Sequence, residues 1–336
     1  MFPAVVAVAQ GVGSIGTHPF VWVLLACGLD RLIGDPRWCP HPVVLMGWCI
    51  ARLRSLAEAW AVDDPRRLRL AGGCITLLLV GGSGAAGWAL TTLVQLAPPG
   101  SWLQLMALAA LLVALASALA GRSLEQAVQV VLQALASGDL PLARQRLAWI
   151  VGRDTDGLSE PEVLRALAET ASENAVDGLF APLFWMLVGA CFGQPLALAL
   201  GFKAASTLDS MLGYRRGRLR WLGTAGARLD DLLVWLPCRL VALSLGQLRA
   251  ALCDGAPDPS PNAGVSQAAY AHAVGVQLGG LNRYGGEQRA KPLLAAGSPP
   301  PDAIAVQRML QLSRRLQLLW LATGALVVFY VTKALS

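Results

Sequence analysis

The chain has 336 residues, of which 55% are hydrophobic and only 14% are charged, and its mean hydropathy is +0.53. A soluble domain usually carries about a quarter charged residues, so this composition excludes an ordinary soluble domain and a disordered chain. The net charge of +6 predicts attraction to anionic lipid and not to nucleic acid, because no basic block is interleaved with aromatic residues. The sequence therefore predicts an integral membrane protein.

Long apolar segments with few or no charged residues predict the membrane spans, because a helix that crosses the hydrocarbon core needs about 20 apolar residues. These segments lie at 18–33, 70–96, 102–120 and 316–332. The first is expected to be a retained span, since no basic segment precedes it as in a signal peptide. A Pro-Pro turn at 97–101 separates the second span from the third.

Two further apolar segments, 178–202 and 232–250, leave their path through the membrane open. A full crossing of 178–202 would place Lys203 and the arginines after it outside, although Lys and Arg tend to stay in the cytoplasm. Gly193-Gln194-Pro195 divides that segment into two short pieces, so we favour a re-entrant or protein-buried hairpin over a simple span. Arg239 interrupts 232–250 and raises the same question.

The predicted fold is all-α, with about four to six membrane-embedded helices in one domain over residues 1–336. Both termini are expected outside, and the polar segments are expected in the cytoplasm. Ser159 and Glu162 fit a capping box at the start of a helix that continues to Val176. No period-two alternation persists long enough to predict a sheet.

Glu169, Glu173 and Asp177 recur at every fourth position, which places three carboxylates along one face of a helix. Such acids repel one another unless a cation or a basic group lies among them, and a merely solvated face would normally include Lys or Arg. Carboxylates that face substrate phosphates are the usual way in which a protein holds Mg²⁺. We therefore predict a Mg²⁺ site here, and a solvated helix face is the alternative.

Three more polar clusters adjoin apolar segments, where polar groups are costly unless they are paired or used. The cluster that runs from Asp30 to Met46 also fits helix capping and a turn. A second cluster mixes both charges, which fits a site for phosphates and Mg²⁺ and fits a buried ion-pair network equally well. Its members include Lys203, Thr207, Asp209, Tyr214, Arg228, Asp230, Asp231 and Arg239. The third, from Ser260 to Lys291, has glycines that permit either close approach of a ligand or tight turns.

Together the four clusters resemble the CobD/CbiB family of cobalamin biosynthesis, the adenosylcobinamide-phosphate synthases. The matching stretches are DRLIGDPRWCPHPVVLMG (30–47), GRDT with ETASENAVDGLFAPLFW (152–155, 169–185), KAASTLDSMLGY with GARLDD and PCRL (203–214, 226–231, 237–240), and PNAG with GVQLGG and RYGG (261–264, 275–280, 283–286). They occur in the family's order over most of the chain. Ser206 departs from the family, which commonly has Asn there, and so does Trp48, where a polar residue is frequent.

The resemblance implies a multi-pass ligase of the bacterial inner membrane. The family attaches (R)-1-amino-2-propanol or its O-phosphate to a propionate carboxyl of adenosylcobyric acid, using ATP and Mg²⁺, and forms adenosylcobinamide or its phosphate. The expected partners are therefore the corrinoid, the amino alcohol and the lipid bilayer, together with other enzymes of the cobalamin pathway.

Roles for individual residues follow as hypotheses under this resemblance. The expected Mg²⁺ ligands are Glu169, Glu173, Asp177, Asp230 and Asp231. Polar residues expected to bind ATP or the amino alcohol phosphate are Asn174, Thr207, Tyr214, Arg228, Arg239 and Asn262. The expected catalytic groups are Asp35, His41, Lys203 and Asp209. Of these, Lys203 would neutralise phosphate, and Asp35 or His41 would take the proton from the attacking ammonium, because only the neutral amine is nucleophilic.

Three other functions stay open. A non-catalytic AmpE-like membrane regulator is disfavoured because all four polar clusters are retained. A transporter would line a permeation path with its buried charges, but no inverted repeat is apparent in the sequence. A CDP-alcohol phosphotransferase would fit Gly226-Ala227-Arg228 followed by Asp230-Asp231, but the longer spaced-Asp motif of that family is absent.

Overall fold

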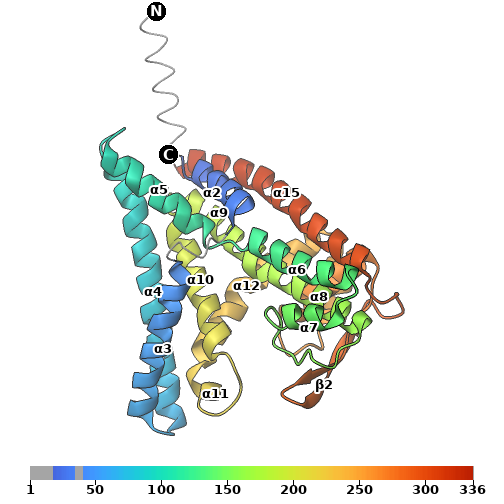
Figure 1. The fold of residues 1–336 in the computed structure, drawn as a ribbon. Coiled ribbons are helices and arrows are strands. Elements are labelled where there is room, and N and C mark those ends of the chain that lie inside the picture. Colours follow the sequence, from blue (N-terminus) through green and yellow to red (C-terminus); the bar gives the residue numbers. More distant parts are fainter. Residues whose placement is uncertain (1–17, 35–40, 336) are drawn as a thin grey trace, which may run out of the picture. The chain divides into compact units, whose positions relative to one another are not determined.

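The computed structural model describes residues 18–34 and 41–335, most of which are helical (Figure 1). Contacts between Cα atoms divide the chain into two compact units. Unit 1 comprises Met1–Ala120, Pro182–Leu232 and Leu321–Ser336, and unit 2 comprises Gly121–Ala181 and Leu233–Trp320. Each unit therefore joins segments that lie far apart in the sequence.

Unit 1 is built from helices alone in its described residues. They are α2 (Pro19–Ile33), α3 (Pro42–Ala61), α4 (Pro65–Leu96), α5 (Trp102–Ala116), most of α9 (Ala181–Cys191), α10 (Pro195–Leu212), α11 (Leu219–Leu222), the start of α12 (Thr224–Ser244) and the end of α15 (Ala303–Leu335). The helices α3 and α10 pack along α4. Gly87 permits this close approach, since a Cβ there would lie 2.6 Å from the Leu196 carbonyl oxygen.

Unit 2 combines helices with one β-hairpin. Its elements are α6 (Gly121–Ala136), α7 (Leu140–Leu147), α8 (Glu160–Ala175), the π-helix η1 (Val176–Phe180), the remainder of α12, α13 (Leu248–Gly255), α14 (Ala263–Val274), β1 (Leu278–Tyr284), β2 (Glu287–Leu294) and most of α15. Tyr270 in α14 and Ser313 in α15 share a buried hydrogen bond of 2.7 Å. Glu125 in α6 accepts two 2.6 Å hydrogen bonds from Arg314, which ties α6 to α15.

The helical character predicted from the sequence is confirmed, and so are several helix boundaries. The capping box at Ser159 and Glu162 begins α8 as expected. The Pro-Pro turn separates α4 from α5, and the break at residues 192–194 separates α9 from α10. The expectation that the chain contains no sheet is wrong, because β1 and β2 form an antiparallel pair with Leu281 opposite Ala290.

Three helical segments of the described chain are long and apolar enough to cross a membrane: Pro65–Leu96, Glu160–Cys191 and Ala303–Ala334. A fourth arises if α5 and α6 together form one broken span. The polar segment 160–177, expected in the cytoplasm, is continuous with the first part of 178–202 in one helical run. The 15 residues of α2 extend about 22 Å, which is shorter than the hydrocarbon core.

Candidate functional site

The first polar group, which we term the acidic cluster, consists of Lys203, Asp209, Asp230 and Asp231 in unit 1. Lys203 and Asp209 project from α10, and the two adjacent aspartates lie in the second turn of α12. The other three residues are within electrostatic range of the Asp230 carboxylate. One oxygen of Asp230, Oδ1, is buried without a hydrogen-bond partner among the described residues. The cluster therefore contains a buried acceptor that a cation or a donor group could satisfy.

Burial and like charges alter the ionisation of this cluster. Burial, with smaller contributions from Asp209 and Asp231, raises the pKa of Asp230 from 3.8 to about 7, and Lys203 opposes the change. Burial also raises the pKa of Asp231, against the attraction of Arg215. A bound cation would favour the ionised form of both carboxylates.

Two glycines explain how distant parts of the sequence form the acidic cluster. A Cβ at Gly226 in α12 would lie 3.0 Å from Cβ of Leu208, so this glycine lets α12 approach α10 closely. At Gly213 a Cβ would lie 2.1 Å from Oδ1 of Asp209, so any side chain there would displace the Asp209 carboxylate. The glycines of KAASTLDSMLGY and GARLDD therefore have a packing role beside the acids.

The other expected site residues of unit 1 have varied surroundings. The Thr207 hydroxyl donates to the Lys203 carbonyl at 2.7 Å, which is a hydrogen bond within α10. Tyr214 is exposed beneath the Arg216 guanidinium, and Arg228 is exposed. His41 is the N-cap of α3, and its Nδ1 accepts from the Val43 amide at 3.3 Å. Asp35 lies outside the described residues.

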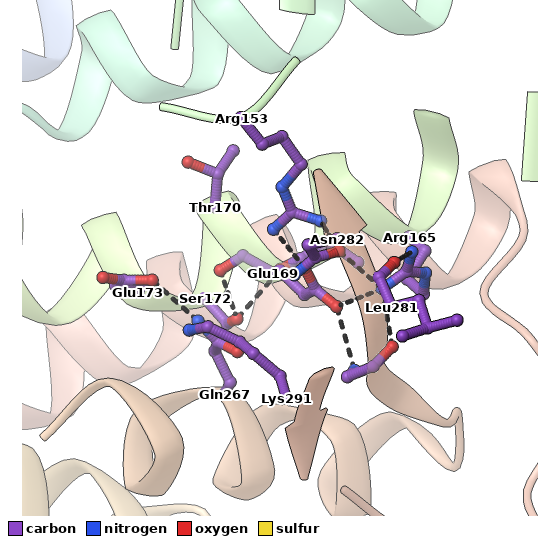
Figure 2. A network of polar contacts seen from close by, with 12 residues as sticks. Arg153, Arg165, Glu169, Thr170, Ser172, Glu173, Gln267, Leu281, Asn282 and Lys291 are labelled. Carbon is purple, nitrogen blue, oxygen red and sulfur yellow. Dashed lines mark hydrogen bonds and ion pairs between the residues drawn. The ribbon is translucent and has the colours of Figure 1, made fainter. Parts of the chain in front are cut away.

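The second polar group, the Glu169 network, consists of Arg153, Arg165, Glu169 and Asn282 in unit 2 (Figure 2). The Glu169 side chain is 1% exposed and is ion-paired with both arginines. It also accepts a 2.9 Å hydrogen bond from the Gly279 amide. Both guanidinium groups donate to Oδ1 of Asn282 on β1, at 2.8 and 3.0 Å. The network therefore fastens the hairpin to α8.

Basic groups lie beside the first of the three acids. Arg165 lies one turn before Glu169, and Arg153 reaches the same carboxylate from the preceding loop. Asp177 lies in the π-helical turn Val176–Phe180, whereas Glu169 and Glu173 lie in α8. No group of three or more His, Cys, Asp or Glu side chains in the described chain is arranged to hold a metal ion. The geometry therefore gives no support to Glu169 as a Mg²⁺ ligand.

Glu173 has partners that the sequence did not reveal. It accepts a 2.7 Å hydrogen bond from Nε2 of Gln267 in α14, whose Oε1 is buried without a partner among the described residues. Lys291 on β2 is within electrostatic range of Glu173 and forms a 3.4 Å ion pair with Asp258 (Figure 2 shows Glu173, Gln267 and Lys291). These partners were missed because they lie about 90 or more residues further along the chain.

The remaining expected residues of unit 2 also pair locally. Asn174 donates to the Thr170 hydroxyl at 3.0 Å. Asp177 and Glu173 are both within electrostatic range of the Cys238 thiol. The structure brings two predicted residues together, because Arg239 donates to Oδ1 of Asn262 at 2.7 Å.

The Arg239 guanidinium also stabilises the turn at the start of α14. It donates to the Pro261 carbonyl at 2.8 Å and lies over the Trp235 ring, 4.5 Å from its centroid. The PCRL and PNAG stretches therefore form one structural contact.

Comparison with known proteins shows to which family the chain belongs. The family model described as CobD/Cbib protein matches residues 23–313. The chain belongs to this family. A CobD/CbiB relative in Synechocystis, named cobalamin biosynthesis protein CobD, is 41% identical over 93% of this chain and 94% of its own length. The resemblance inferred from the four clusters is thereby confirmed.

Two further CobD/CbiB relatives support the same assignment. The CobD protein of Geobacter metallireducens is 43% identical over 84% of this chain and 88% of its own. The CbiB protein of Salmonella choleraesuis is 38% identical over 92% of this chain and 96% of its own. No solved structure matches the chain. Membership of this family supports a role in cobalamin biosynthesis.

Proposed function

We propose that the protein is a membrane-bound ligase that joins (R)-1-amino-2-propanol, or its O-phosphate, to a propionate carboxyl of adenosylcobyric acid with consumption of ATP. Family membership supports the pathway, and the acidic cluster supports the chemistry. The observation that carries the proposal is Oδ1 of Asp230, which is buried without a hydrogen-bond partner in the described part of the chain and lies within electrostatic range of Lys203 and Asp209. This arrangement combines acceptors for a cation with a donor for phosphate.

Amide formation requires an activated carboxyl group, because a carboxylate is a poor electrophile. Transfer of a phosphoryl group from ATP would form an acyl phosphate, which the amine attacks with release of phosphate. Positioning and charge neutralisation supply most of the catalysis in phosphoryl transfer. In this proposal Lys203 neutralises phosphate charge as it develops.

The residues present fit Mg²⁺ in the form in which it accompanies ATP. Mg²⁺ usually binds one or two protein carboxylates and completes its coordination with phosphate oxygens and water. Asp209 and Asp230 would hold the ion, and a three-acid protein cage is not required. When bound, Mg²⁺ would neutralise phosphate charge and orient the ATP.

The attacking ammonium must lose a proton to a base, for which Asp35 and His41 are the two candidates. The hydrogen bonding of His41 disfavours it in this role. Its Nδ1 already accepts the Val43 amide, so the neutral ring carries its proton on Nε2. Such a ring has no second lone pair for a substrate proton. Our proposal therefore favours Asp35 as the base.

Complementation tests the proposed reaction in a strain that lacks the aminopropanol-attachment step. The wild-type gene is expected to restore growth on cobyric acid, and Asp230→Asn is expected to abolish that growth. Glu287→Gln, a matched change of an exposed acid on β2, is expected to behave as the wild type. Growth on cobinamide, which bypasses the step, serves as the control for every strain.

Two outcomes would contradict the proposal. The first is a wild-type protein that is present in the membrane but fails to support growth on cobyric acid. The second is purified protein that forms the amide, detected by mass spectrometry, at the same rate with and without ATP.

A further inference from the structure

We infer that a cavity between α14 and α15 binds a phosphate-bearing anion. The cavity has a volume of about 310 Å³, at the lower end of the range for small-molecule sites. It lies within unit 2 and is lined by Ala273, Val274, Arg308, Gln311, Leu312 and Arg315. None of these residues belongs to the acidic cluster or the Glu169 network, and the inference does not depend on the proposed ligase activity.

The lining is cationic and contains no acid. Arg308, Gln311 and Arg315 follow one another at intervals of three and four positions, so they share one face of α15. Neither Arg308 nor Arg315 has an ion pair or a hydrogen bond with any residue that the structure describes. By contrast, the adjacent Arg314 is neutralised by Glu125 through two hydrogen bonds of 2.6 Å. Arg314 therefore has a structural role, whereas the adjacent Arg315 lines the cavity without a counter-charge among the described residues.

Spacing and chemistry indicate the kind of ligand. Seven residues along an α-helix correspond to about 10.5 Å, which two extended arginine side chains can bridge to one phosphate group or to a diphosphate. A guanidinium group can donate two parallel hydrogen bonds to the oxygens of a phosphate group, and the Gln311 side-chain amide adds an uncharged donor. An apolar ligand would leave both charges unpaired, so the lining favours an anion.

The location of the cavity on α15 is compatible with two kinds of phosphate-bearing ligand. Arg315 directly precedes the uncharged segment 316–332, which is part of a candidate membrane span. A lipid headgroup and a soluble phosphate ester can both be present at such a boundary. The shared chemistry is the phosphate group, and the experiment distinguishes the sources.

Binding is measured with the full-length protein and two probes. Inorganic pyrophosphate is titrated calorimetrically into protein in a neutral detergent at constant ionic strength. In parallel, native mass spectrometry counts the lipids retained after reconstitution with phosphatidylcholine alone or with added phosphatidylglycerol. Arg308→Gln with Arg315→Gln removes the cationic lining. Arg249→Gln with Arg289→Gln removes the same charge from exposed positions elsewhere in unit 2 and serves as the control.

The lining variant is expected to weaken binding of one probe by at least about tenfold, because two charge-assisted hydrogen-bonding groups are lost. The control variant is expected to stay within about twofold of the wild type, as is usual for exposed charges. Arg308→Lys with Arg315→Lys should recover part of the affinity, which excludes misfolding as the cause. Loss of pyrophosphate binding identifies a soluble ligand, and loss of phosphatidylglycerol alone identifies a lipid. Equal binding of both probes by wild type and lining variant would overturn the inference.

Discussion

Replacement of Glu169 by glutamine tests whether this residue is structural or a metal ligand. The substitution removes the charge that neutralises Arg153 and Arg165, whose side chains are 9% and 17% exposed. Removal of one partner from a buried ion pair costs about 3–5 kcal/mol. Glutamine keeps one carbonyl oxygen that can still accept from the Gly279 amide or from one arginine. We therefore expect the free energy of unfolding to fall by about 3 kcal/mol, at the lower end of that range.

Thermal unfolding in detergent with a thiol-reactive fluorophore measures this loss. Cys238 is buried and free, and it lies in unit 2 with Glu169. In a background whose other cysteines are replaced by serine, its labelling therefore reports the unfolding of that unit. Glu169→Gln should lower the labelling temperature by several degrees. Glu160→Gln, at the exposed start of the same helix, serves as the control and should cost less than about 1 kcal/mol.

A double-mutant cycle sharpens the comparison. Arg153→Gln and Glu169→Gln together should destabilise less than the sum of the single changes, because the first change already breaks their contact. A metal-ligand role predicts a different pattern, with wild-type stability and a raised Mg²⁺ requirement for product formation. If Glu169→Gln showed that pattern, the structural assignment of Glu169 would be refuted.

Three further predictions concern the acidic cluster and the hairpin. The pKa of Asp230 is raised to about 7, so its contribution to stability is present below its unfolded value of 3.8 and is lost as the pH rises through about 7. In Mg²⁺-free buffer the unfolding temperature should fall less steeply with rising pH in Asp230→Asn than in the wild type. An equal dependence on pH in both proteins would contradict the raised pKa of Asp230. Gly279→Ala should open the hairpin, because the glycine has φ +84° and a Cβ there would lie 1.9 Å from the Pro292 carbonyl oxygen. Trypsin should then cleave after Arg289 faster than in the wild type, and equal cleavage rates would count against this strain. Asp154→Ala removes the acceptor of the two glycine amides in the hairpin turn, at 3.0 and 2.7 Å, and should speed the same cleavage with little change in the unfolding temperature of the whole protein.

Helix boundaries in this chain could be predicted because their determinants are local. The Pro-Pro turn at 97–101 separates the end of α4 at Leu96 from the start of α5 at Trp102. Ser159 and Glu162 cap α8 within four residues. Hydrogen bonds of this kind depend on neighbouring residues alone, so the sequence pattern is sufficient to identify them.

The hairpin could not be predicted because distant residues hold it. The strand β1 begins with a bulge between Leu278 and Gly280, which interrupts any alternation of apolar and polar positions. Its backbone is bound by Arg165, which donates to the Gly279 and Leu281 carbonyls at 2.6 and 2.9 Å. Tertiary contacts therefore stabilise strands whose own sequence does not favour them.

The spacing of Glu169, Glu173 and Asp177 predicted a helix but could not predict which groups bind these acids. A repeat of four positions places side chains on one face of a helix, but it does not say which groups pack against that face. Glu169 is neutralised by arginines, and Glu173 is bound by Gln267. The Asp230 carboxylate, by contrast, has a buried oxygen without a hydrogen-bond partner among the described residues.

The electrostatic interaction between Asp209 and Asp230 depends on the packing of α10 against α12, which the spacing of residues along the chain does not show. Gly226 permits that packing, because its missing side chain lets Leu208 approach to within 3.0 Å of the Cβ position. A larger residue at position 226 should therefore separate the two acids without altering either of them. If Gly226→Val kept the ionisation behaviour of Asp230 unchanged, the packing of these helices would not be what forms the cluster.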